Sequence, residues 1–324
     1  MEDFNNPEFG YPGDECFRDG FMEASKEFDP AALDVDLTGK SFMVTGSNTG
    51  IGKNVTVELA KRGGRVHMLC LNADQATRTE IIKDSANENV HLHVLDLSQL
   101  RRVYKFAKKF AENWKTLDVL VNCAACVLPT RELTEDGFET NFAMNTMGVY
   151  ILTKTLLPLL GQTPGSRVIM VSTQGVFTEK LSLDRLADLK KEKLDPFDGH
   201  KVYAQSKRQQ LIMLTTWART HSAIHFAGMH PGIVDTPLLR CYLPPAVYET
   251  AKRNGRFKTP AEGADTVVWL AASEGAVQQT SGQFYFDRKA TSSHKWDFTR
   301  STEAEEQQMM EKLEELAMGI TSKD

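Results

Sequence analysis

The chain has 324 residues, of which 41% are hydrophobic and 25% are charged, and its formal net charge at pH 7 is −5. This composition is typical of a globular protein with one large core, and the negative charge argues against a nucleic-acid partner and a basic face for anionic membranes. The sequence contains no run of 18 apolar residues, no signal-peptide pattern and no disulfide framework among its five cysteines. We therefore expect a cytoplasmic protein without a transmembrane segment.

Three regions follow one another along the chain. Residues 1–39 form an acidic extension, and the sequence leaves open whether this extension packs on the core. Regular hydrophobic patterns fill residues 40–290, which we expect to form a single domain. Residues 291–324 form a tail with a charged helix over 302–319, whose apolar residues recur at helical spacing. We expect this helix to dock on the domain, and binding to a partner is the alternative.

Short apolar segments alternate with amphipathic segments in the central region. Helices are predicted between these segments, including a long one over 137–160. The seven predicted strands cover residues 41–45, 66–70, 91–97, 117–122, 167–171, 223–229 and 283–286. Alternating strands and helices imply right-handed crossovers, so we predict an α/β fold with a doubly wound, seven-stranded parallel sheet of the Rossmann type. Such a sheet binds its ligand at the carboxyl edge.

A glycine-rich turn follows the first predicted strand. Gly46 permits a tight turn, Gly50 lets the backbone approach a pyrophosphate, and Gly52 lets the next helix pack closely on the sheet. The N-terminus of that helix would then face the phosphates. The sequence therefore predicts a dinucleotide site whose turn consists of Gly46, Ser47, Asn48, Thr49, Gly50, Ile51 and Gly52.

Other strand ends supply further candidate contacts with the cofactor. Asp96 follows the third strand, where its carboxylate can accept a hydrogen bond from the adenine amino group; a helix N-cap is the alternative. A rigid turn over 231–236 follows the sixth strand and ends in a hydroxyl placed to bond the carboxamide. Beyond the glycine turn, the predicted contacts are Asn72, Asp96, Leu97, Asn122, Ala124, Tyr203, Lys207, Pro231, Gly232, Val234 and Thr236.

The chemistry is predicted at Tyr203 and Lys207, which lie four residues apart and therefore on one face of a helix. Tyr203 is the predicted proton donor, and Lys207 would favour its phenolate and hold the ribose hydroxyls. Ser172 and Thr173 end the fifth strand, where either hydroxyl can orient the substrate oxygen. Asparagine is unfavourable inside a helix without another role, so we expect Asn145 to hold a water joined to Lys207. The alternative is a half-buried tyrosine beside an ordinary exposed lysine.

The sequence predicts no metal site. Cys123 and Cys126 form a C-x-x-C motif, but no second pair completes a zinc site. The remaining candidate ligands are scattered and have no cysteine or aspartate partners at ligand spacing: His91, His93, His221, His225 and His230.

These motifs resemble those of the short-chain dehydrogenase/reductases. T-G-x-x-x-G-x-G appears at 45–52, Y-x-x-x-K at 203–207 and P-G-x-x-x-T at 231–236, and the resemblance covers about residues 38–290. It implies an NAD(P)-dependent oxidoreductase that reduces a carbonyl or oxidises the matching alcohol. It also implies that Asn145 belongs to the catalytic set.

The chain departs from the family pattern after the fourth and fifth strands. Asn122-Cys123-Ala124-Ala125 stands where the family has N-N-A-G, and the catalytic serine of the family falls on Thr173, with Ser172 before it. A catalytically weak member that binds a dinucleotide in a structural or sensing role is therefore the alternative function. A scaffold that works through its two tails would need a partner motif, and none is recognisable.

The sequence determines specificity less closely. An Asp or Glu after the second strand selects NAD and an Arg accommodates NADP, whereas this chain has Leu71-Asn72-Ala73-Asp74 there. We expect NADP or NAD to bind, with a slight preference for NADP by analogy to relatives. An apolar lid after Thr236 favours a small hydrophobic carbonyl or alcohol substrate, core packing being its alternative role: Leu238, Leu239, Tyr242, Leu243, Val247 and Tyr248. Assembly into a homo-oligomer stays open.

Overall fold

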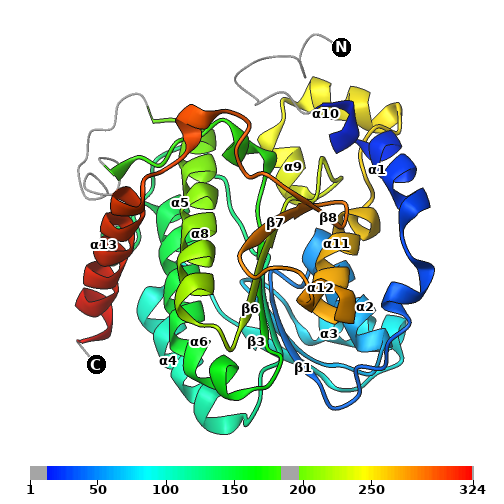
Figure 1. Cartoon of the computed structure of the whole chain (residues 1–324), viewed down its shortest axis with the longest axis horizontal. Coiled ribbons are helices and arrows are strands. Elements are labelled where there is room, and N and C mark those ends of the chain that lie inside the picture. The colour runs from blue at the N-terminus through cyan, green and yellow to red at the C-terminus, as the bar shows by residue number, and fades with distance from the viewer. Residues whose placement is uncertain (1–12, 184–196, 323–324) are drawn as a thin grey trace.

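An eight-stranded sheet crosses the centre of the molecule (Figure 1). The computed structural model describes residues 13–183 and 197–322. The strands are β1 (Ser41–Thr45), β2 (Arg65–Cys70), β3 (Val90–Val94), β4 (Val119–Asn122), β5 (Arg167–Val171), β6 (His225–Met229), β7 (Gln283–Phe286) and β8 (Lys289–Thr291), in the order β3-β2-β1-β4-β5-β6-β7-β8. The first seven are parallel, which confirms the predicted doubly wound fold. The eighth is an additional antiparallel edge strand.

A two-residue turn joins the edge strand β8 to β7, and the sequence pattern does not predict this turn. Asp287 and Arg288 both have positive φ, 44° and 60°. Hairpin turns of this kind usually contain Asn or Gly. The turn therefore depends on tertiary contacts, because the Asp287 carboxylate and the Arg288 guanidinium are both held in ion pairs.

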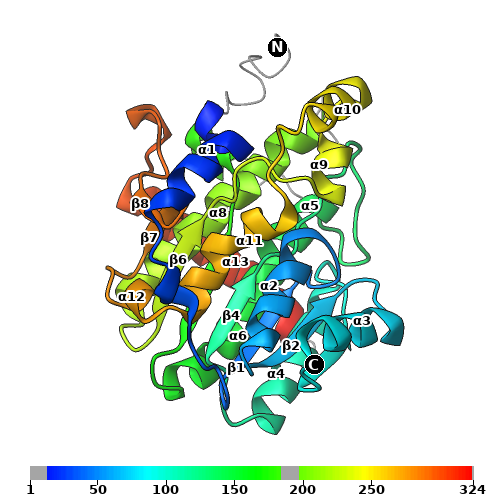
Figure 2. The same ribbon diagram turned by 90° about the vertical axis from the view of Figure 1, so that its right-hand side faces the viewer.

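Helices cover both faces of the sheet (Figures 1 and 2). Side chains alternate along each strand, so neighbours such as Met43 and Val44 enter different cores. The core that contains Met43 is covered by α4 (Leu100–Asn113), α6 (Val149–Gln162), α8 (Gly199–Thr220) and α13 (Glu303–Thr321). The core that contains Val44 is covered by α2 (Gly50–Lys61), α3 (Gln75–Ser85), α11 (Pro260–Ala272) and α12 (Glu274–Val277).

The single helix expected over 137–160 is divided in the structure. It consists of α5 (Thr140–Phe142), a π-helix (Ala143–Gly148) and α6. The start lies later than expected because the Glu139 carboxylate accepts hydrogen bonds from the backbone of Asn141 and Phe142, and so caps the helix. π-turns occur frequently at functional sites, and this one carries Asn145.

Both ends of the described chain pack on the body. Short helices at the N-terminus lie beside β8 and α11 in both views: η3 (Asp14–Cys16), α1 (Arg18–Ala24), η4 (Ser25–Glu27) and η5 (Pro30–Leu33). At the other end α13 begins with a capping box between Thr302 and Glu305 and buries Met309, Leu313, Ala317 and Ile320 against α4 and α8. No helix within 13–183 or 197–322 is long and apolar enough to cross a membrane.

Candidate active site

Two adjoining cavities open at the carboxyl edge of the sheet, where the sequence placed the ligand. The first, of about 140 Å³, is lined by Ser172, Thr173, Tyr203 and Lys207, and by residues 231–234. The second, of about 260 Å³, is lined by the glycine turn, Ala124 and Leu97. They share lining residues, namely Ile51, Cys123, Ala125, Thr236 and Leu238. The arrangement therefore suits one elongated ligand that spans both cavities.

Glycine is sterically required at the turn after β1. Gly46 has φ +68°, and a Cβ there would lie 2.9 Å from Ala124 Cα. A Cβ on Gly52 would lie 2.2 Å from the Gly46 carbonyl oxygen, so only glycine lets α2 start this close to the sheet. Thr45 Oγ1 accepts hydrogen bonds from the backbone of Cys123 and Ala124, at 2.9 Å each, which ties the turn to the end of β4.

Several predicted cofactor contacts point elsewhere in the structure. The Asp96 carboxylate accepts hydrogen bonds from the amide and hydroxyl of Ser98, at 2.8 and 2.7 Å, in the turn before α4, whose N-cap is Gln99 and not Asp96. Asn122 Nδ2 donates to Thr153 Oγ1 at 3.1 Å. Together with Ser47 and Asn72, these residues do not line either cavity. Leu95 and Leu97 form the wall of the second cavity instead.

Tyr203 and Lys207 lie side by side on α8, with the Lys207 Nζ 5.9 Å from the centre of the Tyr203 ring. Both are buried, at 8% and 1% exposure, which argues against the alternative of an exposed lysine. Burial is the main reason that the pKa of the Tyr203 phenol is raised and that of the Lys207 ammonium is lowered to about 8. The phenol is therefore protonated at neutral pH in the chain without ligand.

The two hydroxyls at the end of β5 differ in their contacts. The Ser172 Oγ is buried and has no hydrogen-bond partner within the described residues. Thr173 Oγ1 accepts a long hydrogen bond of 3.4 Å from the Gly175 amide. Both residues line the first cavity, so each keeps a hydroxyl proton that it can donate there.

The side chain of Gln210 connects Asn145 to Lys207, a role that was not predicted from the sequence. The Asn145 side chain is occupied by the backbone of Cys126, whose amide donates to Oδ1 at 3.0 Å and whose carbonyl accepts from Nδ2 at 2.8 Å. The Asn145 carbonyl accepts from Gln210 Nε2 at 2.5 Å, and Gln210 Oε1 accepts from Lys207 Nζ at 3.2 Å. The spacing of three residues between Lys207 and Gln210, about one helical turn, is the only feature of the sequence that indicates this contact.

The loop over residues 231–236 is held between the N-terminal segment and the chain around Lys258. The Ile233 amide donates to the Cys16 carbonyl at 2.8 Å, and the Ile233 carbonyl accepts from the Lys258 amide at 2.9 Å. Gly232 has φ +78°, and a Cβ there would lie 2.4 Å from the Cys16 oxygen. Glycine is thus required at this position by the N-terminal segment.

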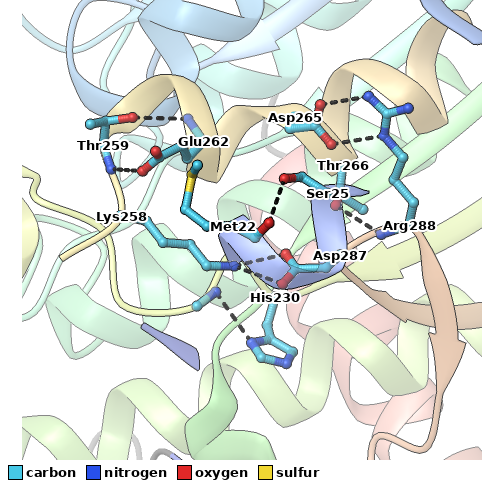
Figure 3. A network of polar contacts seen from close by, with 11 residues as sticks. Met22, Ser25, His230, Lys258, Thr259, Glu262, Asp265, Thr266, Asp287 and Arg288 are labelled. Atoms are coloured by element: carbon cyan, nitrogen blue, oxygen red, sulfur yellow. Dashed lines mark hydrogen bonds and ion pairs between the residues drawn. The ribbon is translucent and has the colours of Figure 1, made fainter. Parts of the chain in front are cut away.

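A buried ion pair lies beneath this loop. Lys258 Nζ is fully buried and contacts both carboxylate oxygens of Asp287, at 2.7 and 3.0 Å (Figure 3). The rings of Phe21 and Phe286 lie 4.9 and 4.6 Å from the same nitrogen. Phe286 also stacks on His230, with ring centres 4.1 Å apart. The N-terminal segment therefore covers the charge that supports the loop.

The apolar residues after Thr236 divide into two groups. Leu238, Leu239 and Tyr242, on α9 (Pro237–Tyr242), line the first cavity. Leu243 and Tyr248 pack with Ala251, which lies on α10 (Pro245–Arg253), and with Phe257, which follows that helix. Val247 is half-buried. Leu239 and Tyr242 also pack against this cluster, so core packing is observed, and the role of a lid over substrate stays a prediction.

The histidines and cysteines form no metal site in the described part of the chain. His67, His91 and His93 stack against one another between β2, β3 and the aromatic residues of α4. Burial lowers the pKa of His67 to about 2 and that of His93 to about 4, so both rings are neutral at pH 7. Burial also raises the pKa of the Cys126 thiol to about 12, which leaves it without thiolate character.

The sequence is similar to known proteins over most of its length. The short chain dehydrogenase family model matches residues 40–181. Over 306 residues the chain is 47% identical to dehydrogenase/reductase SDR family member 12 from Bos taurus, covering 94% of each chain. Retinol dehydrogenase 12 from Bos taurus is 33% identical over 263 residues, 80% of this chain and 81% of the other.

The fold is also that of solved structures. An uncharacterised protein from Mycobacterium paratuberculosis superimposes with a TM-score of 0.64 at 22% identity, over 89% of this chain and 95% of the other. This likeness concerns the fold, whereas the 47% identity above extends over almost the entire sequence. The chain belongs to the short-chain dehydrogenase/reductase family of oxidoreductases.

Proposed function

We propose that this chain reduces a carbonyl group of a small hydrophobic compound with a nicotinamide cofactor, or oxidises the matching alcohol. The observation that carries the proposal is the meeting of Tyr203, Lys207 and two free hydroxyl protons, of Ser172 and Thr173, on one cavity wall. The buried Tyr203 phenol keeps its proton at neutral pH, as a donor in carbonyl reduction must.

The residues present fit a dinucleotide that extends from the first cavity into the second. The glycine turn leaves backbone room at the start of α2, where a pyrophosphate would face the helix N-terminus. When bound, the nicotinamide supplies the hydride. Thr236 and residues 231–234 would border the nicotinamide, and Lys207 would hold the ribose hydroxyls. The roles of Asp96, Asn122 and Asn72 as cofactor contacts have less support, because their side chains turn to other partners or to solvent.

The chain's own residues then divide the proton chemistry between them. Tyr203 donates its proton to the substrate oxygen as negative charge develops there. The hydroxyl of Thr173 or Ser172 donates a hydrogen bond to the same oxygen and orients it. The ammonium of Lys207 stabilises the phenolate that Tyr203 leaves behind, and the donor is restored when that phenolate regains a proton. In alcohol oxidation the same groups work in the opposite sense.

The lining of the first cavity supports a hydrophobic substrate. Leu238, Leu239 and Tyr242 border it beside Val171 and Ile233. Burial of apolar surface against such side chains stabilises bound substrate by about 25 cal/mol for each Å² removed from water. A relative at 33% identity is named for retinol, which is itself a lipophilic alcohol. Lipid aldehydes, retinoids and steroids are the classes we propose to test.

Either dinucleotide suits the second cavity, and we propose a slight preference for NADP. Leu71 is half exposed beside this cavity, and no carboxylate stands there to repel a 2′-phosphate. The nearby Lys53 is engaged by Glu80 at 2.6 Å, which lowers the positive potential it offers. Without a dedicated charge contact we expect discrimination within about tenfold, or about 1.4 kcal/mol.

The decisive experiment compares Tyr203→Phe with the parent in a cofactor-oxidation screen across carbonyl classes. Loss of the hydroxyl should lower turnover by roughly 100-fold or more, while the ring keeps its packing and cofactor affinity stays nearly unchanged. Tyr285→Phe is the control, because this buried tyrosine bonds Gln283 at 3.0 Å and lines neither cavity. Near-normal turnover of Tyr203→Phe would refute the mechanism.

The same screen addresses the alternative function. A parent protein that binds the dinucleotide but turns over no carbonyl or alcohol would be a cofactor-binding protein with a structural or sensing role. The meeting of the buried Tyr203 and Lys207 with Thr173 on one cavity is what favours the enzyme.

A further inference from the structure

Gln210 lies at the centre of a buried chain of hydrogen bonds behind the site. It follows Tyr203 by seven residues and Lys207 by three, so all three project from one face of α8. Its amide oxygen accepts from Lys207 Nζ at 3.2 Å, and its amide nitrogen donates to the Asn145 carbonyl at 2.5 Å. Gln210 is fully buried. A side chain of the protein thus joins the π-helix to the ammonium of Lys207.

The surroundings of Lys207 show why the contact with Gln210 matters for the orientation of the ammonium. The ammonium donates to the Val171 carbonyl at 2.7 Å and to Gln210, and no carboxylate pairs with it among the residues that the structure describes. Two neutral acceptors therefore fix two of its three N–H directions. The third is left for the open side, where Tyr203 and the cavity lie. Without the amide, the ammonium would be free to rotate away from that direction.

We propose that Gln210 is a positioning residue for the oxidoreductase reaction, which holds the Lys207 ammonium between Asn145 and Tyr203. The inference rests on the proposed function. An amide suits this task because it does not ionise at the pH of catalysis, so it neither cancels the charge of Lys207 nor competes for the proton of Tyr203.

The neighbouring Gln209 provides a matched control. It is buried at 3% exposure and accepts a hydrogen bond of 2.7 Å from the hydroxyl of Thr146, the residue after Asn145. Gln209 thus joins the same two elements, α8 and the π-helix, through the same kind of contact. It does not touch Lys207. A purely structural role for the glutamine pair predicts similar losses from both positions.

The test uses Gln210→Met, Gln210→Glu and Gln209→Met in the full chain. Methionine keeps the unbranched shape without the acceptor, so Gln210→Met should lower kcat by about tenfold and weaken NADPH binding severalfold. Gln209→Met should retain both within about twofold, although its unfolding midpoint falls. Binding is measured by the fluorescence of NADPH, which reports on the site even without turnover.

The pH profile supplies the readout that a structural role would not move. A carboxylate in Gln210→Glu would lie close to the ammonium and raise the pKa values of Lys207 and Tyr203 together, so the alkaline limb of carbonyl reduction should move up by about one pH unit. Gln210→Met should move it down, since the charged form of Lys207 loses an acceptor. The other titratable groups facing this pair are the thiols of Cys123 and Cys126 and the phenol of Tyr242.

Three outcomes would overturn the inference. They are an unchanged kcat and NADPH affinity in Gln210→Met, equal effects at Gln209 and Gln210, and an alkaline limb that stays in place in Gln210→Glu. Failure of the proposed function would look different: the parent itself would lack turnover. If the parent binds NADPH without turnover, the affinities of Gln210→Met and Gln209→Met still decide whether Gln210 holds Lys207.

Discussion

The first cavity has two walls that are built in different ways. The catalytic wall consists of Ser172 and Thr173 at the end of β5 and of Tyr203 and Lys207 on α8, with Gln210 buried behind Lys207. Its geometry follows from helical spacing within one element and from the end of one strand. The loop wall, residues 231–236, has no regular structure before α9 and is held by Cys16 and Lys258, which are remote in the sequence.

Because the two walls are held in different ways, we expect them to contribute differently to function. Changes to the hydroxyl groups of the catalytic wall should alter the rate of the chemical step and leave the cofactor affinity nearly unchanged, whereas changes to Lys207 or to its support Gln210 should weaken cofactor binding as well. Changes beneath the loop wall should alter stability and cofactor affinity together, because the loop keeps its shape only while its supports are in place. Four predictions test this separation.

The largest effect is expected at the ion pair beneath the loop wall. Asp287→Asn keeps the shape of the side chain and tolerates the positive φ of this position, but leaves the fully buried Lys258 ammonium without a counter-charge. We expect the free energy of unfolding to fall by about 3 kcal/mol, measured by urea titration, with weaker cofactor binding. Asp265→Asn is the control, since its pair with Arg288 is partly exposed. An equal loss at both positions would contradict this account.

Phe21 links the N-terminal segment to the same ion pair. Phe21→Ala removes a ring that is 8% exposed and covers Lys258, so we expect a loss of about 2–3 kcal/mol and a severalfold rise in the cofactor dissociation constant. Met22→Ala, at a half-exposed neighbour in α1, should change stability by less than about 0.5 kcal/mol. If cofactor affinity survives the loss of Phe21, the segment stabilises the fold without shaping the loop wall.

Thr173 should show the opposite signature on the catalytic wall. Thr173→Ala removes one hydrogen bond to the substrate oxygen in the transition state, and we expect kcat to fall about tenfold, or about 1.4 kcal/mol, with the cofactor dissociation constant unchanged. Ser172→Ala should have the smaller effect. Steady-state kinetics with cofactor titration checks both variants. The reverse ranking would assign the orienting hydroxyl to Ser172.

The smallest effect concerns the second cavity, away from both walls. Leu71→Arg places a guanidinium at a half-exposed position beside the proposed adenosine site, so NADPH should bind about fivefold more tightly while NADH stays within about twofold. Leu133→Arg makes the same substitution at an equally exposed leucine outside both cavities. Fluorescence titration of both cofactors compares them. No gain from Leu71→Arg would mean that another residue reads the 2′ position.

The fold and the catalytic wall could be predicted largely from the sequence because their signals are local. Alternating apolar segments indicated the seven parallel strands, and a spacing of four residues placed Tyr203 and Lys207 on one helical face. Glycine at positions 46 and 52 marked close backbone approaches that the structure shows. The edge strand β8 was missed because its turn uses Asp287 and Arg288 at positive φ, where glycine or asparagine is usual.

What the sequence could not indicate depends on how elements face one another. Helical spacing favours Gln210 over Gln209 as the partner of Lys207, but the sequence does not show that α8 turns both glutamines toward the π-helix, where they meet Thr146 and Asn145. The sequence also left open whether the N-terminal segment packs on the core, because an acidic composition does not reveal that the Cys16 carbonyl accepts a hydrogen bond from the Ile233 amide. Asp96 shows a third kind of limit: both of its predicted roles suit a carboxylate after a strand, whereas in the structure it bonds Ser98 in the turn before α4, and Gln99 is the N-cap.

The position of Gly232 has a practical consequence for handling the protein. The family match begins at residue 40, which invites truncation there to obtain a minimal domain. Such a shortened protein would lack the Cys16 carbonyl, leave the Ile233 amide without its acceptor and uncover Lys258. A weak or inactive truncation product would then report on a damaged loop, and not on the enzyme. Biochemical work should therefore retain the residues before 40, which include Cys16 and Phe21, and limited proteolysis with and without cofactor would show how firmly this segment is bound.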